Sequence, residues 1–170
     1  ITEMLVGDMG QYAHGNQPIQ HAIYLYNWLE QPWKTQMHAR EIMDKLYSSA
    51  PDGLCGDEDN GQTSAWYVFS AIGFYPVTPG TGQYAIGSPL FKNVKLHLQN
   101  GNTFEIKAPK NSKENIYINA IYKNKSPYTK NYITYQDIMN GFVFSTEMSS
   151  KPNRNLGIEQ SSKPYSMSQN

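Results

Sequence analysis

The sequence has little that would cross-link the chain or place it in a membrane. Its 170 residues include one cysteine, Cys55, so no disulfide can form within the chain. No run reaches the roughly 20 apolar residues that a membrane-spanning helix needs. Net charge is also lacking, because 14 Lys and Arg residues balance 14 Asp and Glu residues. This neutrality argues against nucleic acids and anionic membranes as partners, since both attract clustered positive charge.

A signal peptide is missing as well. Because the chain begins at Ile1 rather than Met, and in the middle of a pattern, we interpret it as a piece of a longer protein. On that interpretation the missing signal carries no information about export.

Aromatic and apolar residues, by contrast, are plentiful. Hydrophobic residues make up 39% of the chain, which argues against disorder over most of its length. There are 13 Tyr, 6 Phe and 3 Trp residues. Aromatic faces can pack on sugar rings, but tyrosine and tryptophan also fill ordinary cores. The aromatic content therefore gives only slight support to a sugar-binding site.

Residues 1–80 have the periodicity of helices. Apolar side chains recur there at three- and four-residue spacings, as they do on one face of a helix. We expect helices over Ile19–Leu29, Pro32–Ser48 and Thr63–Ile72. Gly73 should end the third helix, and the prolines that follow should keep it from resuming.

Residues 81–157 change to the alternating pattern of β-strands. Strands are expected over Val94–Leu98, Thr103–Ala108, Tyr117–Tyr122, Ile133–Tyr135 and Phe142–Glu147. Asn100 and Gly101 form a typical hairpin turn between the first two. Residues 158–170 are polar, and we expect this tail to be frayed. The predicted fold class is therefore α+β, with helices followed by an antiparallel β-rich portion.

A short acidic loop, Gly56–Gln62, precedes the third helix and carries three consecutive carboxylates. Asp57 and Asp59 lie two residues apart, so in an extended loop both side chains would point the same way. Two carboxylates directed at one water or one metal ion are a common arrangement in hydrolases. The alternative is a solvated turn whose acidic residues simply cap the helix.

A second polar loop, His14–Pro18, lies where the first helix should begin. Its imidazole and amide groups could bind a ligand or a metal ion. The alternative is that Asn16 only caps the helix. The spacing of these residues does not decide between the two.

Taken together, several segments closely resemble one known family. They are HGNQP, YLYNW with QPWKTQ, GLCGDEDNGQTSAWYVFSAIGFYPVTPGTGQYAIGSPLF, and MSSKPNRNLG, which span roughly residues 11–157. The family is glycoside hydrolase family 92, whose members are calcium-dependent exo-α-mannosidases that invert anomeric configuration. The resemblance implies that residues 1–80 are the last helices of an (α/α)6 barrel. Residues 81–157 would then be the β-rich C-terminal portion, followed by the tail.

The resemblance also assigns roles to the two loops. Asp57 and Asp59 would be the catalytic pair, with Asp59 removing a proton from water and Asp57 orienting it. His14 and Gln17 would bind the substrate, and Asn16, Gln17 and Asp59 would hold calcium. The chain departs from the family at Gln17, where a glutamate is usual, so one negative charge is absent from this region.

The general acid of the family comes from an upstream barrel segment that nothing in this chain matches. We therefore expect the chain to be inactive alone and to need the N-terminal remainder of its protein. The expected substrate is the terminal mannose of glycans, in α-1,2 linkage, and the expected location is secreted, periplasmic or on a bacterial cell surface. The alternative function is that of a non-catalytic carbohydrate-binding fragment.

Overall fold

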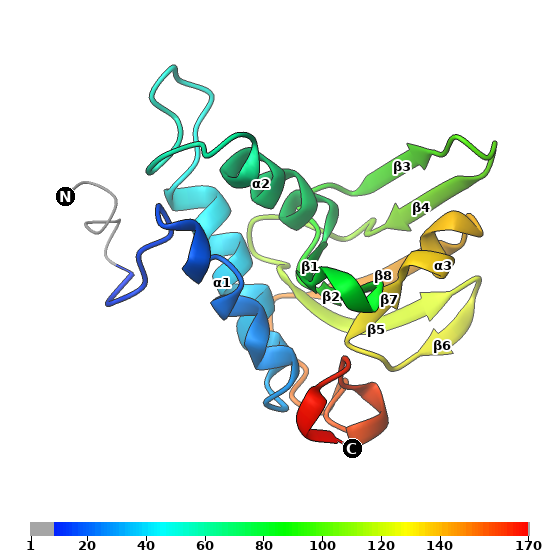
Figure 1. The fold of residues 1–170 in the computed structure, drawn as a ribbon. Coiled ribbons are helices and arrows are strands. Elements are labelled where there is room, and N and C mark those ends of the chain that lie inside the picture. The colour runs from blue at the N-terminus through cyan, green and yellow to red at the C-terminus, as the bar shows by residue number, and fades with distance from the viewer. Residues whose placement is uncertain (1–8, 170) are drawn as a thin grey trace.

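The computed structural model describes residues 9–169, in which the two longer helices lie on one side and the two sheets, with a short third helix, on the other (Figure 1). The helices are α1 (Pro32–Lys45), α2 (Gln62–Ile72) and the short α3 (Tyr135–Met139). The 3-10 helices are η2 (Gln17–Ile19), η3 (Ala22–Asn27), η4 (Pro79–Thr81), η5 (Gln160–Ser162) and η6 (Met167–Gln169). Within residues 9–169, no helix combines the length and apolar character needed to cross a bilayer.

Helices α1 and α2 confirm two of the sequence predictions. Pro32 opens α1, where its missing N–H costs no hydrogen bond. Helix α1 packs against η3, α2 and the sheets. Its buried residues recur every three or four positions; they are Pro32, Thr35, Gln36, Ala39, Ile42 and Met43. Gly73 ends α2 with a backbone φ of 120°, a value that glycine adopts readily.

The prediction of an α-helix over Ile19–Leu29 is wrong, because this segment forms η2 and η3. A 3-10 helix aligns side chains three residues apart. Tyr24 and Asn27 are spaced in this way, and both are fully buried. The Asn27 amide donates to the backbone carbonyls of Ile86 and Asn131, at 2.8 and 3.1 Å. These distant partners favour the tighter turn, and no local pattern in the sequence reveals them.

The strands form two sheets. Their bounds are β1 (Phe74–Thr78), β2 (Gln83–Ile86), β3 (Asn93–His97), β4 (Thr103–Lys107), β5 (Tyr117–Lys123), β6 (Ser126–Tyr128), β7 (Tyr132–Thr134) and β8 (Val143–Ser149). One sheet has the order β1-β2-β7 and the other β3-β4-β8-β5-β6. All pairs are antiparallel except β4 and β8, which run parallel. The α+β prediction is therefore confirmed, with one parallel pair in the larger sheet.

Two buried clusters hold these parts together. The first lies over the sheets and includes Phe74, Phe104 and Phe144. The second lies among the helices, around Trp66 and Tyr24. Phe69 packs against both clusters, so α2 joins the helical side to the sheets.

Two local predictions about the strands need correction. Tyr135 was expected to end a strand, but it begins α3. The cause is a capping box, in which the Thr134 hydroxyl accepts from the Asp137 backbone and the Asp137 carboxylate accepts from the Thr134 backbone. Strands β1, β2 and β6 were not expected at all; β1 and β6 each contain a proline, which argues against a strand in sequence reasoning.

The expectation of a frayed tail is also wrong for residues 158–169. The Ser162 carbonyl accepts a 2.7 Å hydrogen bond from the Asn131 backbone. The Trp28 indole donates to the Tyr165 carbonyl at 3.0 Å, and Lys163 pairs with Glu30 at 2.8 Å. Polar side chains indicated mobility, but the tail is held by its backbone N–H and carbonyl groups and by the Lys163 side chain.

Candidate functional site

The two loops singled out in the sequence meet in the structure. An added Cβ at Gly56 would lie 2.6 Å from the Cα and the carbonyl oxygen of Gly15. Real Cβ atoms do not approach other heavy atoms so closely, so a larger residue at position 56 would force the backbones apart. The absence of a side chain at Gly56 therefore lets the HGNQP loop, residues 14–18, lie directly against the acidic loop, residues 56–62.

Side chains then tie the two loops together. The Gln17 amide nitrogen donates to the Asp57 carbonyl at 2.7 Å and to the Thr63 hydroxyl at 3.2 Å. The Thr63 hydroxyl itself donates to the same Asp57 carbonyl at 2.9 Å. We call this arrangement of Gln17, Asp57 and Thr63 the interloop clasp. It fixes the backbone at the point where the chain enters the acidic loop.

The acidic loop turns sharply just after the clasp. Asp59, Asn60 and Gly61 have φ values of 49°, 55° and 100°, all in the left-handed region. Non-glycine residues adopt this region at an energetic cost, and such conformations persist only where the surroundings hold them. The loop is therefore not extended through Asp59. The prediction that Asp57 and Asp59 point the same way assumed an extended loop, and that assumption does not hold.

Glu58 supplies the helix cap that the alternative interpretation assigned to the whole acidic loop. Its carboxylate accepts from the backbone N–H of Gly61 at 2.5 Å and of Ser64 at 3.4 Å. The hydrogen bonds to Ser64 and Gly61 lower the pKa of this carboxyl. Glu58 is thus engaged at the start of α2. Asp57 and Asp59 are exposed, and within the described part of the chain neither carboxylate has a hydrogen-bonding partner.

His14 lies beneath the clasp and is fully buried. Its Nδ1 lies 2.7 Å from the Tyr12 hydroxyl, and its Nε2 lies 2.7 Å from the Tyr47 hydroxyl. The Tyr47 hydroxyl donates its proton to the Thr63 carbonyl at 3.1 Å. His14 Nε2 must therefore donate to Tyr47, and Nδ1 accepts from Tyr12. The imidazole is neutral, since burial lowers its pKa to about 4.

The geometry thus gives His14 a place in a buried hydrogen-bonded chain. Both ring nitrogens are bonded within the chain, and the ring packs edge-on against Trp66 with centroids 4.3 Å apart. Burial also raises the pKa of Tyr12 and Tyr47, which keeps both phenols protonated. The assignment of His14 to substrate binding stays a prediction.

Asn16 and Gln17 differ in how much of each side chain is free. Asn16 is exposed and makes no cap hydrogen bond at η2, so the capping role considered for it is not seen. Gln17 is half-buried, and its nitrogen is used in the clasp, which leaves its carbonyl oxygen as the remaining donor to a cation. Together with Asp59, these residues offer amide and carboxylate oxygens, the donors that calcium prefers.

The acidic side chains do not form a metal site by themselves. Among residues 9–169, no three His, Cys, Asp or Glu side chains lie close enough together to hold a metal ion. Calcium takes six to eight oxygen ligands. A calcium ion at these loops would therefore need oxygen ligands other than the His, Cys, Asp and Glu side chains of the described residues.

Three contributors to the site had not been singled out: Thr63, Gln20 and Tyr47. Gln20 is fully buried and donates to the His14 carbonyl and to the Thr63 hydroxyl, at 3.2 and 3.3 Å. Sequence reasoning placed Thr63 only as the start of a helix. No sequence signal marks these residues, because the partners of their side chains lie 6 to 46 positions away.

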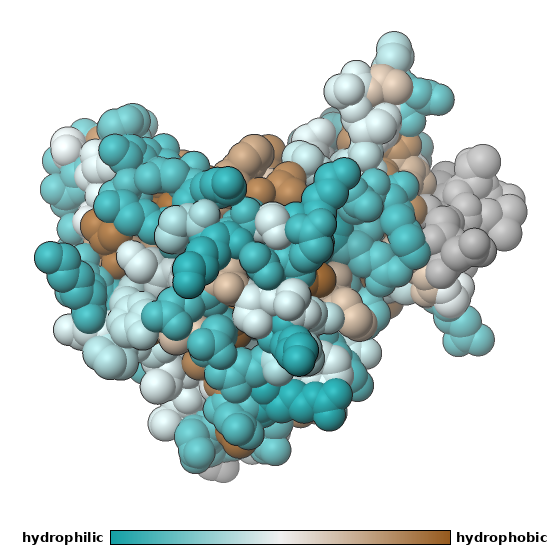
Figure 2. All heavy atoms as spheres, turned by 180° about the vertical axis from the view of Figure 1, so that it is seen from behind, coloured by the Kyte–Doolittle hydropathy of each residue, from teal (hydrophilic) through white to brown (hydrophobic). Residues whose placement is uncertain are grey.

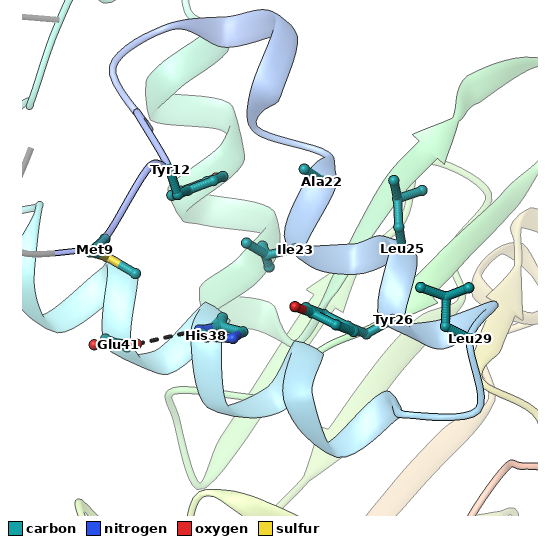
Figure 3. Close-up of a pocket in the computed structure, with 9 residues that line it drawn as sticks. All are labelled: Met9, Tyr12, Ala22, Ile23, Leu25, Tyr26, Leu29, His38 and Glu41. Atoms are coloured by element: carbon teal, nitrogen blue, oxygen red, sulfur yellow. Dashed lines mark hydrogen bonds and ion pairs between the residues drawn. The ribbon is translucent and has the colours of Figure 1, made fainter. Parts of the chain in front are cut away.

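A separate groove of about 590 Å³ lies between η3 and α1. Figure 3 shows its mostly apolar lining, with a His38–Glu41 pair at one side. The lining residues are Met9, Tyr12, Ala22, Ile23, Leu25, Tyr26, Leu29, His38 and Glu41. No predicted site residue is among them.

The back of the molecule is mostly hydrophilic, with hydrophobic residues gathered in a hollow at its upper edge (Figure 2).

Comparison with known proteins gives the class of protein to which the chain belongs. The sequence profile described as the glycosyl hydrolase family 92 catalytic domain matches residues 2–150. The chain therefore belongs to glycosyl hydrolase family 92.

Solved structures and a curated relative agree with this assignment. The chain is 56% identical to the family GH92 inverting mannosidase BT2199 from Bacteroides thetaiotaomicron, with a TM-score of 0.90, covering 95% of this chain and 22% of that one. It is 43% identical to the α-mannosidase BT3965 of the same species, with a TM-score of 0.91 and coverage of 96% and 22%. An uncharacterized secreted glycosidase from Arthroderma benhamiae is 28% identical over 156 residues, which are 90% of this chain and 20% of that protein. The chain thus spans about a fifth of the length of these relatives.

Proposed function

We propose that this chain is the C-terminal part of the catalytic region of an inverting, calcium-dependent exo-α-mannosidase that removes α-1,2-linked terminal mannose from glycans. The observation that carries the proposal is the pair of exposed, unbonded carboxylates, Asp57 and Asp59, on a loop clasped to the HGNQP segment. Family membership and the mannosidase relatives support the same reaction class.

In this mechanism Asp59 is the general base. It accepts a proton from the water that attacks the anomeric carbon, and Asp57 orients that water. An inverting enzyme needs a base and an acid about 6.5–9.5 Å apart, on opposite faces of the sugar. The described residues supply the base side. The acid would come from the remainder of the polypeptide, so the chain alone would be inactive.

Asn16, Gln17 and Asp59 would hold the calcium ion. Their oxygen donors fit a hard cation, and the half-buried Gln17 side chain lies beside the acidic loop. When bound, calcium would hold the 2- and 3-hydroxyls of the mannose and favour a distorted ring. The interloop clasp would fix the backbone of the two loops that carry these calcium ligands. The division into barrel end, β-rich portion and tail stays part of the proposal.

Because the proposed substrate is a glycan, we also propose that the protein acts outside the cytoplasm. The Arthroderma benhamiae relative is described as secreted. A secreted, periplasmic or cell-surface enzyme in a bacterium would meet glycans directly.

The test is Asp59→Asn in the complete protein. Loss of the base should lower kcat at least about 100-fold, the lower end of general-base contributions. Asp52→Asn is the matched control, because Asp52 is also an exposed carboxylate on the segment before the loop. Release of mannose from an α-1,2-linked mannobiose is the measurement. Near-normal turnover by a folded Asp59→Asn enzyme would exclude the proposed mechanism.

A further inference from the structure

Thr63 lies at the centre of the interloop clasp. It is fully buried, and its hydroxyl makes three hydrogen bonds: it donates to the Asp57 carbonyl and accepts from the amides of Gln17 and Gln20. A hydroxyl has one proton and two lone pairs. These three bonds therefore use its full capacity, and each leads to a different segment of the chain.

The backbone of Thr63 extends the same connection. Its carbonyl accepts the Tyr47 hydroxyl, which in turn accepts from His14 Nε2. Its N–H donates to the Glu58 carbonyl at 3.2 Å. One residue thus links the start of α2, both sides of the acidic loop entrance and the buried His14.

We propose that Thr63 is a positioning residue for the hydrolytic reaction. Its hydroxyl fixes the Asp57 carbonyl, and through that peptide it sets the direction in which the Asp57 and Asp59 side chains leave the loop. The inference rests on the proposed function of these two carboxylates.

The strained turn explains why such a bond is needed. Asp59 and Asn60 hold left-handed conformations that the chain does not adopt freely. Gln17 also donates to the Asp57 carbonyl, but its side chain is only half-buried. The bond from the fully buried Thr63 is part-buried, so it is better shielded from competing water than the exposed bond from Gln17. Small displacements of a catalytic group are costly for rate, because the reaction requires aligned atoms.

The experiment compares three variants of the complete protein. Thr63→Val keeps the shape of the side chain and removes all three hydroxyl bonds, whereas Thr63→Ser keeps the hydroxyl. Thr35→Val is the matched control, because Thr35 is also fully buried but bonds only the Ile23 carbonyl, at 2.9 Å. We expect Thr63→Val to lower kcat by about tenfold or more while KM changes less than about threefold. Thr63→Ser should recover most of kcat, and Thr35→Val should lower the melting temperature without lowering kcat.

Equal kcat values for folded Thr63→Val and Thr35→Val would overturn the inference. If Thr63→Val does not fold, Thr63→Ala replaces it, and equal kcat values for Thr63→Ala and Thr63→Ser would then overturn it. Asp59→Asn, measured in the same series, distinguishes failure of the proposed function from failure of the positioning role. If Asp59→Asn retains turnover, the proposed function fails; if only the Thr63 variants retain it, the positioning role alone fails.

Discussion

His14 Nε2 donates to the hydroxyl of Tyr47, 33 residues away, across a distance of 2.7 Å. The bond requires a neutral imidazole whose Nδ1 accepts from Tyr12. Protonation of Nδ1 would turn that acceptor into a donor facing a hydroxyl whose own proton already points at it. The neutral state of His14 is therefore part of the folded arrangement.

A pH dependence follows from this bond. Burial lowers the pKa of His14 in the folded state to about 4, below the ordinary value of 6.5 in the unfolded chain. Between these values the unfolded state binds more protons, so stability falls as pH falls. The full contribution is present above pH 6.5 and is lost on acidification towards pH 4; at most it amounts to about 3 kcal/mol.

His14→Gln should reduce the slope of stability against pH between 6.5 and 4. Urea unfolding of the complete protein at a series of pH values, in the presence of a chelator, provides the measurement. His97→Gln serves as the control, because His97 is exposed on β3. An identical slope for His14→Gln and the unsubstituted protein would contradict the prediction.

Gly56→Ala should destabilise the protein by about 1–3 kcal/mol, the range for overpacked sites. The added Cβ would meet the backbone of Gly15 at 2.6 Å, and backbone atoms cannot move aside as a flexible side chain can. Gly80→Ala is the matched control, since a Cβ there would have no neighbour within 4 Å. The melting temperatures of the two variants should differ clearly, and equal values would mean that the loops do not touch as described.

Gln17→Glu tests both the clasp and the predicted calcium site. An ionised glutamate cannot donate to the Asp57 carbonyl, and its oxygen would face that carbonyl across the present 2.7 Å contact. Without calcium, the variant should therefore melt at a lower temperature than the parent. A cation between the two oxygens would relieve the repulsion, so added calcium should raise the melting temperature of Gln17→Glu more than that of the parent.

Gln11→Glu adds the same charge at an exposed position near the loop and serves as the control. A calcium response of Gln17→Glu that equals the response of the control would remove Gln17 from the predicted ligands. A titration of activity on two mannoside linkages extends the test. A changed linkage preference with unchanged calcium affinity would place the residue at the leaving-group sugar.

The regular elements could be predicted from the sequence because their signals are local. Three of these signals depend only on neighbours within a few residues. They are the spacing of buried residues in α1, the Gly73 stop and the Asn100–Gly101 turn. The 3-10 conformation of η3 could not be predicted in this way. It depends on the Asn27 amide, whose acceptors lie 59 and 104 residues further along the chain.

The candidate site could likewise be predicted only where its signal is local. The acidic loop is visible in the sequence because Asp57, Glu58 and Asp59 are consecutive. The different task of Glu58 is not visible, because it depends on the left-handed turn that brings its carboxylate to the start of α2. Thr63 was equally invisible, since nothing in a threonine at the start of a helix indicates three hydrogen-bonding partners of its hydroxyl.

The contacts of residues 162–165 have a consequence for synthesis on the ribosome. These residues bind Trp28, Glu30 and Asn131, two of which are made more than 130 residues earlier. The corner between η3 and α1 therefore stays without these bonds until almost all of the described chain has been translated. A premature stop before residue 162 would leave the Trp28 indole without its acceptor, and such truncated products should be more accessible to proteases than the finished protein.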